Sequence, residues 1–85
     1  MYDPIHEQIR VKVEFNSHDL KIISFDWQGR EYLVDKINLI TKARKGRELV
    51  WVYYVSNSGG AYKLRYDTES VTWWLEEVTW EENKV

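Results

Sequence analysis

The stretch Leu49-Val50-Trp51-Val52-Tyr53-Tyr54-Val55 decides the fold class, because every one of its residues is apolar. Successive side chains of a strand point to opposite faces, so this pattern indicates a strand that is covered on both sides. Valine and aromatic residues favour strands, and seven residues are few for a helix. We therefore expect a central β-strand here.

The chain before this stretch shows the alternation that is typical of half-buried strands. Apolar and charged residues alternate over residues 9–15. In residues 20–27 the apolar phase shifts between Ile22 and Ile23, which predicts a β-bulge or burial on both sides. Gln28-Gly29 follows, and a two-residue loop that ends in glycine predicts a tight hairpin.

Three further strands are expected at residues 31–42, 62–66 and 71–78. The first of them changes phase near Asp35-Lys36, which would let it bend from one sheet into another. Short polar loops join all these segments, so the sequence predicts an all-β fold, a six-stranded antiparallel meander. The phase shifts favour a sheet curled into a small barrel or barrel-like sheet, and the lack of a helix between the third and fourth strands disfavours an OB-fold.

Length and composition limit the remaining possibilities. The 85 residues predict a single domain over 1–85, with a core over about 8–80 and frayed ends. The chain has no cysteine, which excludes disulfides and thiolate chemistry, and its net charge of −2 excludes binding to DNA through bulk positive charge. Because the start lacks the pattern of a signal peptide and no apolar run is long enough to span a membrane, we expect a cytoplasmic protein with no membrane partner.

Residues that carry chemistry are sparse. His6 and His18 are the only histidines, and zinc sites need three or four ligands at defined spacings, so no metal is expected. Neighbouring Glu76 and Glu77 should point to opposite faces of a strand and form no acid–base pair. The glycine-rich residues 56–60 lie between two expected strands and do not form a phosphate loop. We therefore expect no enzyme activity and no cofactor.

The unusual feature is the number of aromatic residues, which include five tryptophans and six tyrosines. Such rings fill the centre of a small barrel, but adjacent Trp73 and Trp74 must face opposite sides. Surface rings beside Lys and Arg can stack on single-stranded bases, whereas a charged hairpin tip also simply prevents aggregation. The candidate binding surface consists of Trp27, Arg30, Lys42, Arg44, Lys45, Arg47, Lys63, Arg65, Trp73 and Trp74.

Several short motifs resemble a known family. The segment from Trp27 to Val34 reads W-x-G-R-x-Y-x-V, residues 59–67 read G-G-A-Y-K-L-R-Y-D, and residues 73–78 read W-W-L-E-E-V. This order is similar to that of a bacterial family of small β domains without an assigned activity. Its members stand alone or lie at the C-terminus of proteins related to Y-family translesion polymerases, of the mutasome type. The resemblance implies an accessory role near DNA repair and supplies no catalytic residues.

These observations lead to two function hypotheses. The first is a non-enzymatic module for protein–protein interaction or assembly, with a protein partner or a homo-dimer formed through surplus aromatic residues. The second is an accessory domain that binds single-stranded nucleic acid through its rings and its basic tip. A small-ligand or enzyme site at a barrel mouth has the least support from the sequence.

Overall fold

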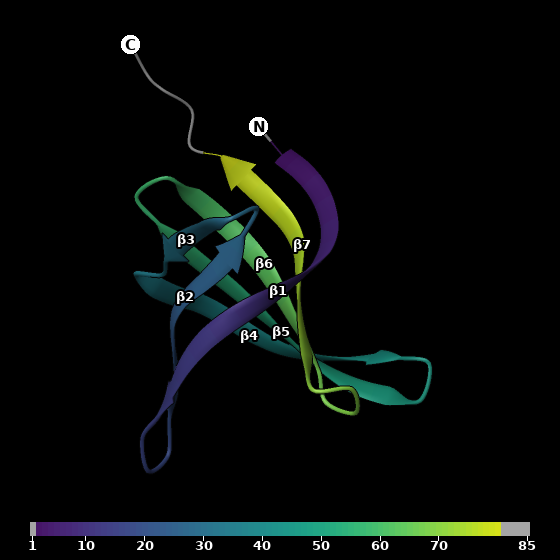
Figure 1. Cartoon of the computed structure of the whole chain (residues 1–85). Helices are drawn as coiled ribbons and strands as arrows, with labels where there is room; N and C mark the ends of the chain where they lie inside the picture. Colours follow the sequence, from purple (N-terminus) through teal and green to yellow (C-terminus); the bar gives the residue numbers. More distant parts are fainter. Residues whose placement is uncertain (1, 81–85) are drawn as a thin grey trace.

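The computed structural model describes residues 2–80, which form an all-β antiparallel meander without a helix (Figure 1). The strand order in the sheet is β3-β2-β1-β7-β6-β5-β4. Within this part of the chain, no helix is long and apolar enough to cross a membrane. The seven strands are β1 (Tyr2–Phe15), β2 (Leu20–Trp27), β3 (Arg30–Leu33), β4 (Lys36–Lys45), β5 (Glu48–Asn57), β6 (Gly60–Asp67) and β7 (Thr72–Trp80).

The expected long strand over residues 31–42 is in fact two strands, so the sheet has seven strands and not six. The break lies at Val34 and Asp35, where the predicted phase change occurs. The Val34 amide donates to the Ile23 carbonyl at 2.9 Å, and the Asp35 amide donates to the Ser56 carbonyl at 3.0 Å. The chain therefore pairs with β2 before the break and with β5 after it.

Strand β1 is longer than predicted, because it begins at Tyr2 and not near residue 9. Its residues 2–9 pair with β7, and its residues 10–15 pair with β2. Pro4 is compatible with this strand because the first half of β1 pairs on one side only. The N-terminal segment is therefore part of the sheet and not a frayed end. The predicted fraying of residues 81–85 lies outside the described residues.

The sheet curls over its own core but does not close, so the term barrel applies only loosely. Strands β3 and β4 are its two edges. Phe25 on β2 meets Tyr62 on β6 edge to face at 5.1 Å, although β1 and β7 lie between these strands in the sheet order. The buried core consists of Ile9, Ile22, Phe25, Trp27, Tyr53, Val55, Tyr62, Leu64, Leu75 and Val78.

The register of the sheet shifts at four places, and two of these bear on the predictions. The β1–β2 register shifts between Lys12 and Val13 and leaves Ile23 as the extra residue, which confirms the predicted bulge. The β6–β7 register passes from Glu77 directly to Leu75, so Glu76 is an extra residue there. Leu75 and Val78 both face inward. Glu76 and Glu77, which stand between them in the sequence, both lie on the outer face, where they meet Arg65 and Lys63. The expectation that these glutamates face opposite sides is therefore wrong.

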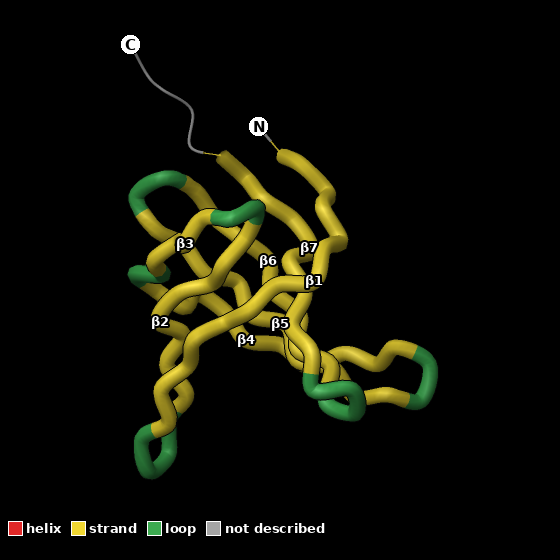
Figure 2. The backbone as a smooth tube through the Cα atoms, viewed as in Figure 1, coloured by secondary structure: helices red, strands yellow, loops and turns green. Residues whose placement is uncertain are grey.

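The turns set the outline of the molecule. The hairpin at Gln28-Gly29 is confirmed, with φ angles of 53° and 73°, which suits the twist of a two-residue hairpin. At the other end of the sheet, the β1–β2 turn and the β4–β5 turn project away from each other (Figures 1 and 2).

Candidate binding surfaces

An apolar hollow lies between the projecting hairpins, on the inner face of the sheet. Its volume is about 320 Å³, at the lower end of the roughly 300–1,000 Å³ that is typical of ligand pockets. Strands β1, β2, β5, β6 and β7 all contribute to it. This aromatic cleft is lined by Val13, Phe15, Leu20, Trp51, Tyr53, Tyr66, Val71 and Trp73.

The wall of the aromatic cleft is a packed set of rings. The centroid of the Trp73 ring lies 5.4 Å from that of Tyr53 and 4.8 Å from that of Tyr66, and both ring pairs are tilted. Burial, followed by the nearby Tyr66 hydroxyl, raises the pKa of Tyr53 above its ordinary value of 10.0. The wall therefore consists of packed rings, and its Tyr53 hydroxyl is uncharged at neutral pH.

The rim of the aromatic cleft is apolar and exposed. Phe15 is 76% exposed and Val71 is 67% exposed. Val71 also has a φ of 56°, a conformation that β-branched residues rarely adopt and that costs about 1–3 kcal/mol. Its amide donates to the Asp67 carbonyl at 2.9 Å, which holds this turn. The turn thus keeps Val71 exposed at the rim, although valine disfavours a positive φ.

Positive charge lies beside the aromatic cleft. The Lys42 ammonium is 4.9 Å from the centroid of the Trp51 ring. Lys42 and Arg44 pair with Trp51 and Leu49, and side chains two apart on a strand share a face. Lys45 falls on the other face and Arg47 in the turn. Four exposed residues form a group that is here called the basic tip: Lys42, Arg44, Lys45 and Arg47. Strand β4 continues to Lys45, beyond the expected end of this strand at residue 42.

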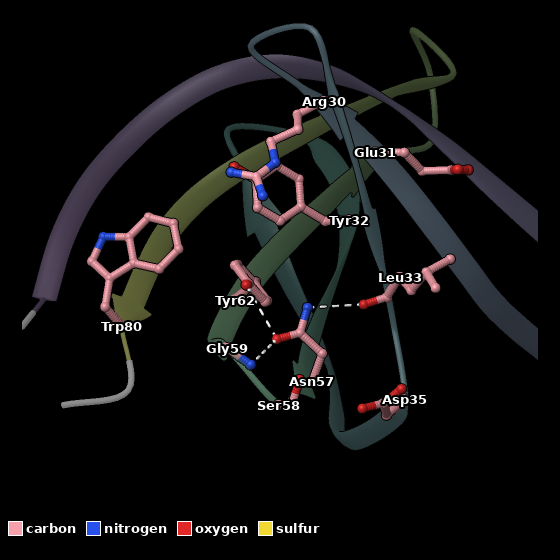
Figure 3. Close-up of a pocket in the computed structure, with 10 residues that line it drawn as sticks. All are labelled: Arg30, Glu31, Tyr32, Leu33, Asp35, Asn57, Ser58, Gly59, Tyr62 and Trp80. Carbon is pink, nitrogen blue, oxygen red and sulfur yellow. Dashed lines mark hydrogen bonds between the residues drawn. The ribbon is translucent and has the colours of Figure 1, made fainter. Parts of the chain in front are cut away.

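A polar hollow of about 470 Å³ lies at the other end of β5 and β6 (Figure 3). Its main organiser is Asn57, whose side-chain oxygen accepts from the Gly59 amide at 2.8 Å and from the Tyr62 hydroxyl at 3.3 Å. The Asn57 amide group donates to the Leu33 carbonyl at 2.9 Å. These bonds tie the end of β3 to the β5–β6 turn, so they serve the fold.

Arg30 and two rings border the same hollow (Figure 3). The Arg30 guanidinium lies 5.7 Å from the centroid of the Tyr32 ring, in a cation–π arrangement. The arginine that leaves the hairpin therefore lies against a ring of its own strand. The Trp80 indole lines the hollow as well and donates to Asp3 at 3.3 Å. The Arg30 and Trp80 side chains that border the polar hollow are thus engaged by other residues of the domain.

An ion pair beside this hollow gives a pH prediction. Glu31 accepts from Lys12 at 2.9 Å and from Ser24 at 2.8 Å. The Lys12 hydrogen bond, then the Ser24 bond and the Lys12 charge, lower the pKa of Glu31 below 4.5. The ionised form is favoured in the folded chain, so this stabilisation is present above pH 4.5 and is lost as pH falls through the lowered pKa.

We therefore expect Glu31→Gln to reduce the free energy of unfolding at pH 7 and to have less effect in acid. Urea unfolding of both proteins across the acid range measures the difference between them. Lys12→Gln should reproduce part of the loss. Parallel stability curves for the wild type and Glu31→Gln at all pH values would contradict this assignment.

The outer face carries a half-buried charge network. The Arg65 Nε donates to Asp67 Oδ1 at 2.7 Å, and its Nη1 donates to Glu76 Oε1. His6 Nδ1 lies 2.6 Å from Glu76 Oε2. The guanidinium also lies 5.2 Å from the centroid of the Trp74 ring. The bulge at Glu76 is what places its carboxylate between Arg65 and His6.

Lys63 lies on this face as well, 3.4 Å from Glu77 and with its ammonium 5.9 Å from the centroid of the Tyr54 ring. Burial alone would lower the pKa of Lys63, but Glu77, Tyr54 and Glu76 together outweigh burial and raise that pKa. Lys63 is therefore a cation engaged within the domain.

The structure divides the predicted binding surface among several places. Trp27 belongs to the core, where it is 7% exposed and stacks on Trp80 at 6.1 Å, so its assignment to a surface is wrong. Arg30 borders the polar hollow, and Lys63, Arg65 and Trp74 lie on the outer face. Of the predicted surface, Trp73 lines the aromatic cleft and Lys42 lies over its Trp51, whereas Lys45 falls on the other face of β4 and Arg47 in the turn.

Trp73 and Trp74 do face opposite sides, as predicted. The sequence did not indicate the other residues of the aromatic cleft. Phe15 ends an alternating strand and Val71 begins the segment after a turn, so both read as ordinary strand residues. Their common position depends on the curl of the sheet, which no local pattern specifies.

No group of three or more His, Asp or Glu side chains suited to a metal ion occurs within residues 2–80. No family model matches the chain, and neither a curated protein nor a solved structure matches it. The resemblance to the polymerase-linked β domains therefore stays an expectation from the sequence.

Proposed function

We propose that the chain is a non-enzymatic binding module that takes up a protein partner in the aromatic cleft. The observation that carries this proposal is the exposed apolar rim, Phe15 and Val71, around a wall of packed rings. Exposed apolar patches on small domains mark interaction sites. Aromatic residues in a well-packed pocket are also the residues that dominate binding energy at protein interfaces.

The size and the support of the aromatic cleft agree with this proposal. A hollow of about 320 Å³ suits one anchoring side chain of a partner better than a large cofactor. The rings lie on β5, β6 and β7, which are paired strands, so little ordering is required when a partner binds.

Selection from a random dodecapeptide display library tests the proposal. We expect enriched peptides that carry an aromatic or large aliphatic residue. The double variant Phe15→Ser, Val71→Asn should bind them at least about tenfold more weakly, since it removes two apolar rim contacts. Asparagine tolerates the positive φ at position 71, so the fold should be retained.

Leu33→Ser is the matched control. Leu33 is exposed and apolar like the rim residues but borders the polar hollow, so its replacement should leave peptide binding unchanged. Circular dichroism of all variants checks that they fold. Two results would contradict the proposal: no peptide enriched above background, or peptides that bind the double variant as tightly as the wild type.

The basic tip supports a second candidate, an accessory domain for single-stranded nucleic acid of the kind that the sequence resemblance implies. Lys42 beside Trp51 is the observation in its favour. However, Lys42 occupies the space over that ring, and the Trp73 ring is engaged by Tyr53 and Tyr66. Stacking of bases needs free ring faces. Quenching of tryptophan fluorescence by short oligonucleotides that weakens steeply with salt would favour this candidate.

A further inference from the structure

Strand β4 (Lys36–Lys45) is a long open edge of the sheet. It pairs with β5 on one side, and β5 is the only strand of the described chain with which it has more than marginal contact. An edge strand of ten residues presents unpaired backbone donors and acceptors along its other side. Such an edge can accept an added strand from another chain.

The middle of this edge is apolar. Leu39 and Ile40 are 53% and 46% exposed, although they pair with the half-buried Tyr54 and the buried Tyr53 of β5. An extra residue at Asn38 shifts the register just before them. Exposed aliphatic side chains on an edge strand offer contacts to the side chains of an added strand.

The charge on β4 is of one sign. The strand contains four cationic residues and no carboxylate, although the whole chain has a net charge of −2. Lys42 and Arg44 lie beside the aromatic cleft, as described above. The four cations are Lys36, Lys42, Arg44 and Lys45.

This charge disfavours a second copy of the chain as the added strand. An antiparallel pair of β4 strands centred on Ile40 would place Lys36 of each copy opposite Arg44 of the other. Like charges directly opposite in a sheet are destabilising. A strand rich in carboxylates would instead meet a cation at each end of the edge.

We propose that β4 binds an extended acidic segment of a partner protein by strand addition. The added strand lies along the open edge of β4, and its carboxylates meet the cations of that strand. This inference rests on the proposed function, because it names the partner that the binding module takes. Backbone pairing supplies affinity that depends little on sequence, and charge supplies the selectivity.

The test uses the synthetic peptide acetyl-Glu-Val-Glu-Leu-Glu-Val-Glu-amide, titrated into ¹⁵N-labelled protein at low salt. We expect saturable shifts of the amide signals of Leu39, Ile40 and Thr41, and slower hydrogen exchange at those of these amides that point to the open edge rather than to β5. A peptide with Lys at each Glu position should not bind. A peptide with Pro at both Val positions keeps the charge but cannot pair along its length, and it should bind weakly.

Charge variants give the matched control. The variant Lys42→Gln, Arg44→Gln should weaken binding of the acidic peptide about tenfold. The variant Arg10→Gln, Lys21→Gln removes the same charge from exposed positions on β1 and β2, and it should bind the peptide like the wild type.

Four results would overturn the inference. The first is that the acidic peptide fails to bind at millimolar concentration, which would leave the basic edge with a purely protective role. The second is that the peptide binds without any effect on the β4 amides, and the third is that the chain forms a dimer through β4. The fourth is that single-stranded DNA shifts the β4 signals and the peptide does not. The display selection and the Phe15→Ser, Val71→Asn variant test the proposed function separately, so its failure is distinguishable from the failure of strand addition.

Discussion

Phe25→Ala is expected to lower the free energy of unfolding by about 3–5 kcal/mol, the usual loss when a buried phenylalanine is truncated. Phe25 is 1% exposed. Its ring stacks on Tyr32 at 5.2 Å and meets Tyr62 at 5.1 Å. These contacts join strands β2 and β3 to β6 across the core, so the substitution removes packing that holds the curled sheet together.

Urea unfolding followed by circular dichroism measures this loss. A domain of 85 residues has a total stability of about 4–13 kcal/mol, so the expected loss is a large part of it. Phe15→Ala is the control, because Phe15 is exposed and should change stability by no more than about 0.5 kcal/mol. A loss below about 1 kcal/mol for Phe25→Ala would show that the sheet does not curl over this ring.

Arg65→Met is expected to lower the free energy of unfolding by about 2–4 kcal/mol, somewhat below the range for breaking a fully buried ion pair. The side chains of Arg65, Asp67 and Glu76 are 15%, 8% and 10% exposed. Removal of the guanidinium leaves both carboxylates poorly solvated and without that cation. The partial exposure of Arg65 is the reason for the discount.

A triple variant separates charge from packing. Arg65→Met, Asp67→Asn, Glu76→Gln removes the unpaired charges together, so it should recover a substantial part of the stability lost by Arg65→Met alone. Arg65→Lys should lie between the wild type and Arg65→Met, because lysine keeps the charge but cannot bond both carboxylates with one planar group. Equal stabilities of Arg65→Met and the wild type would show that the network contributes nothing.

The features that the sequence predicted well are those with a local cause. The hairpin at Gln28-Gly29 needs two residues that accept positive φ, and Gly29 supplies one at no cost. The phase shifts at Ile23 and at Asp35 are visible as breaks in alternation, and each corresponds to a bulge or a strand break. Alternation identified the strand at residues 9–15, and the uninterrupted apolar run from Leu49 to Val55 identified the central strand.

The features that were missed depend on contacts between distant segments. The first half of β1 looks like an irregular terminus with Pro4 in it, and it becomes a strand because β7 pairs with it. The bulge at Glu76 is an exception, because the apolar residues Trp73 and Leu75 are already out of phase with Val78 and Trp80 in the sequence. Local patterns report which residues can form a strand but not which strand lies beside it.

The same limit explains the dispersed candidate surface. Composition drew attention to rings and cations, but Trp27 faces the core and Arg65 faces carboxylates. The aromatic cleft combines residues from five strands and the β6–β7 turn. Only the assembled fold reveals it.

The most direct test of the proposed binding site uses the five tryptophans as reporters. Protein labelled with 5-fluorotryptophan would be titrated with the tightest peptide from the display selection and followed by ¹⁹F NMR. Trp51 and Trp73 line the aromatic cleft, whereas Trp27 and Trp80 stack on each other elsewhere and Trp74 lies on the outer face. We predict that the signals of Trp51 and Trp73 shift while the other three stay in place. Shifts confined to Trp27, Trp74 or Trp80 would contradict the proposal that this cleft is the binding site.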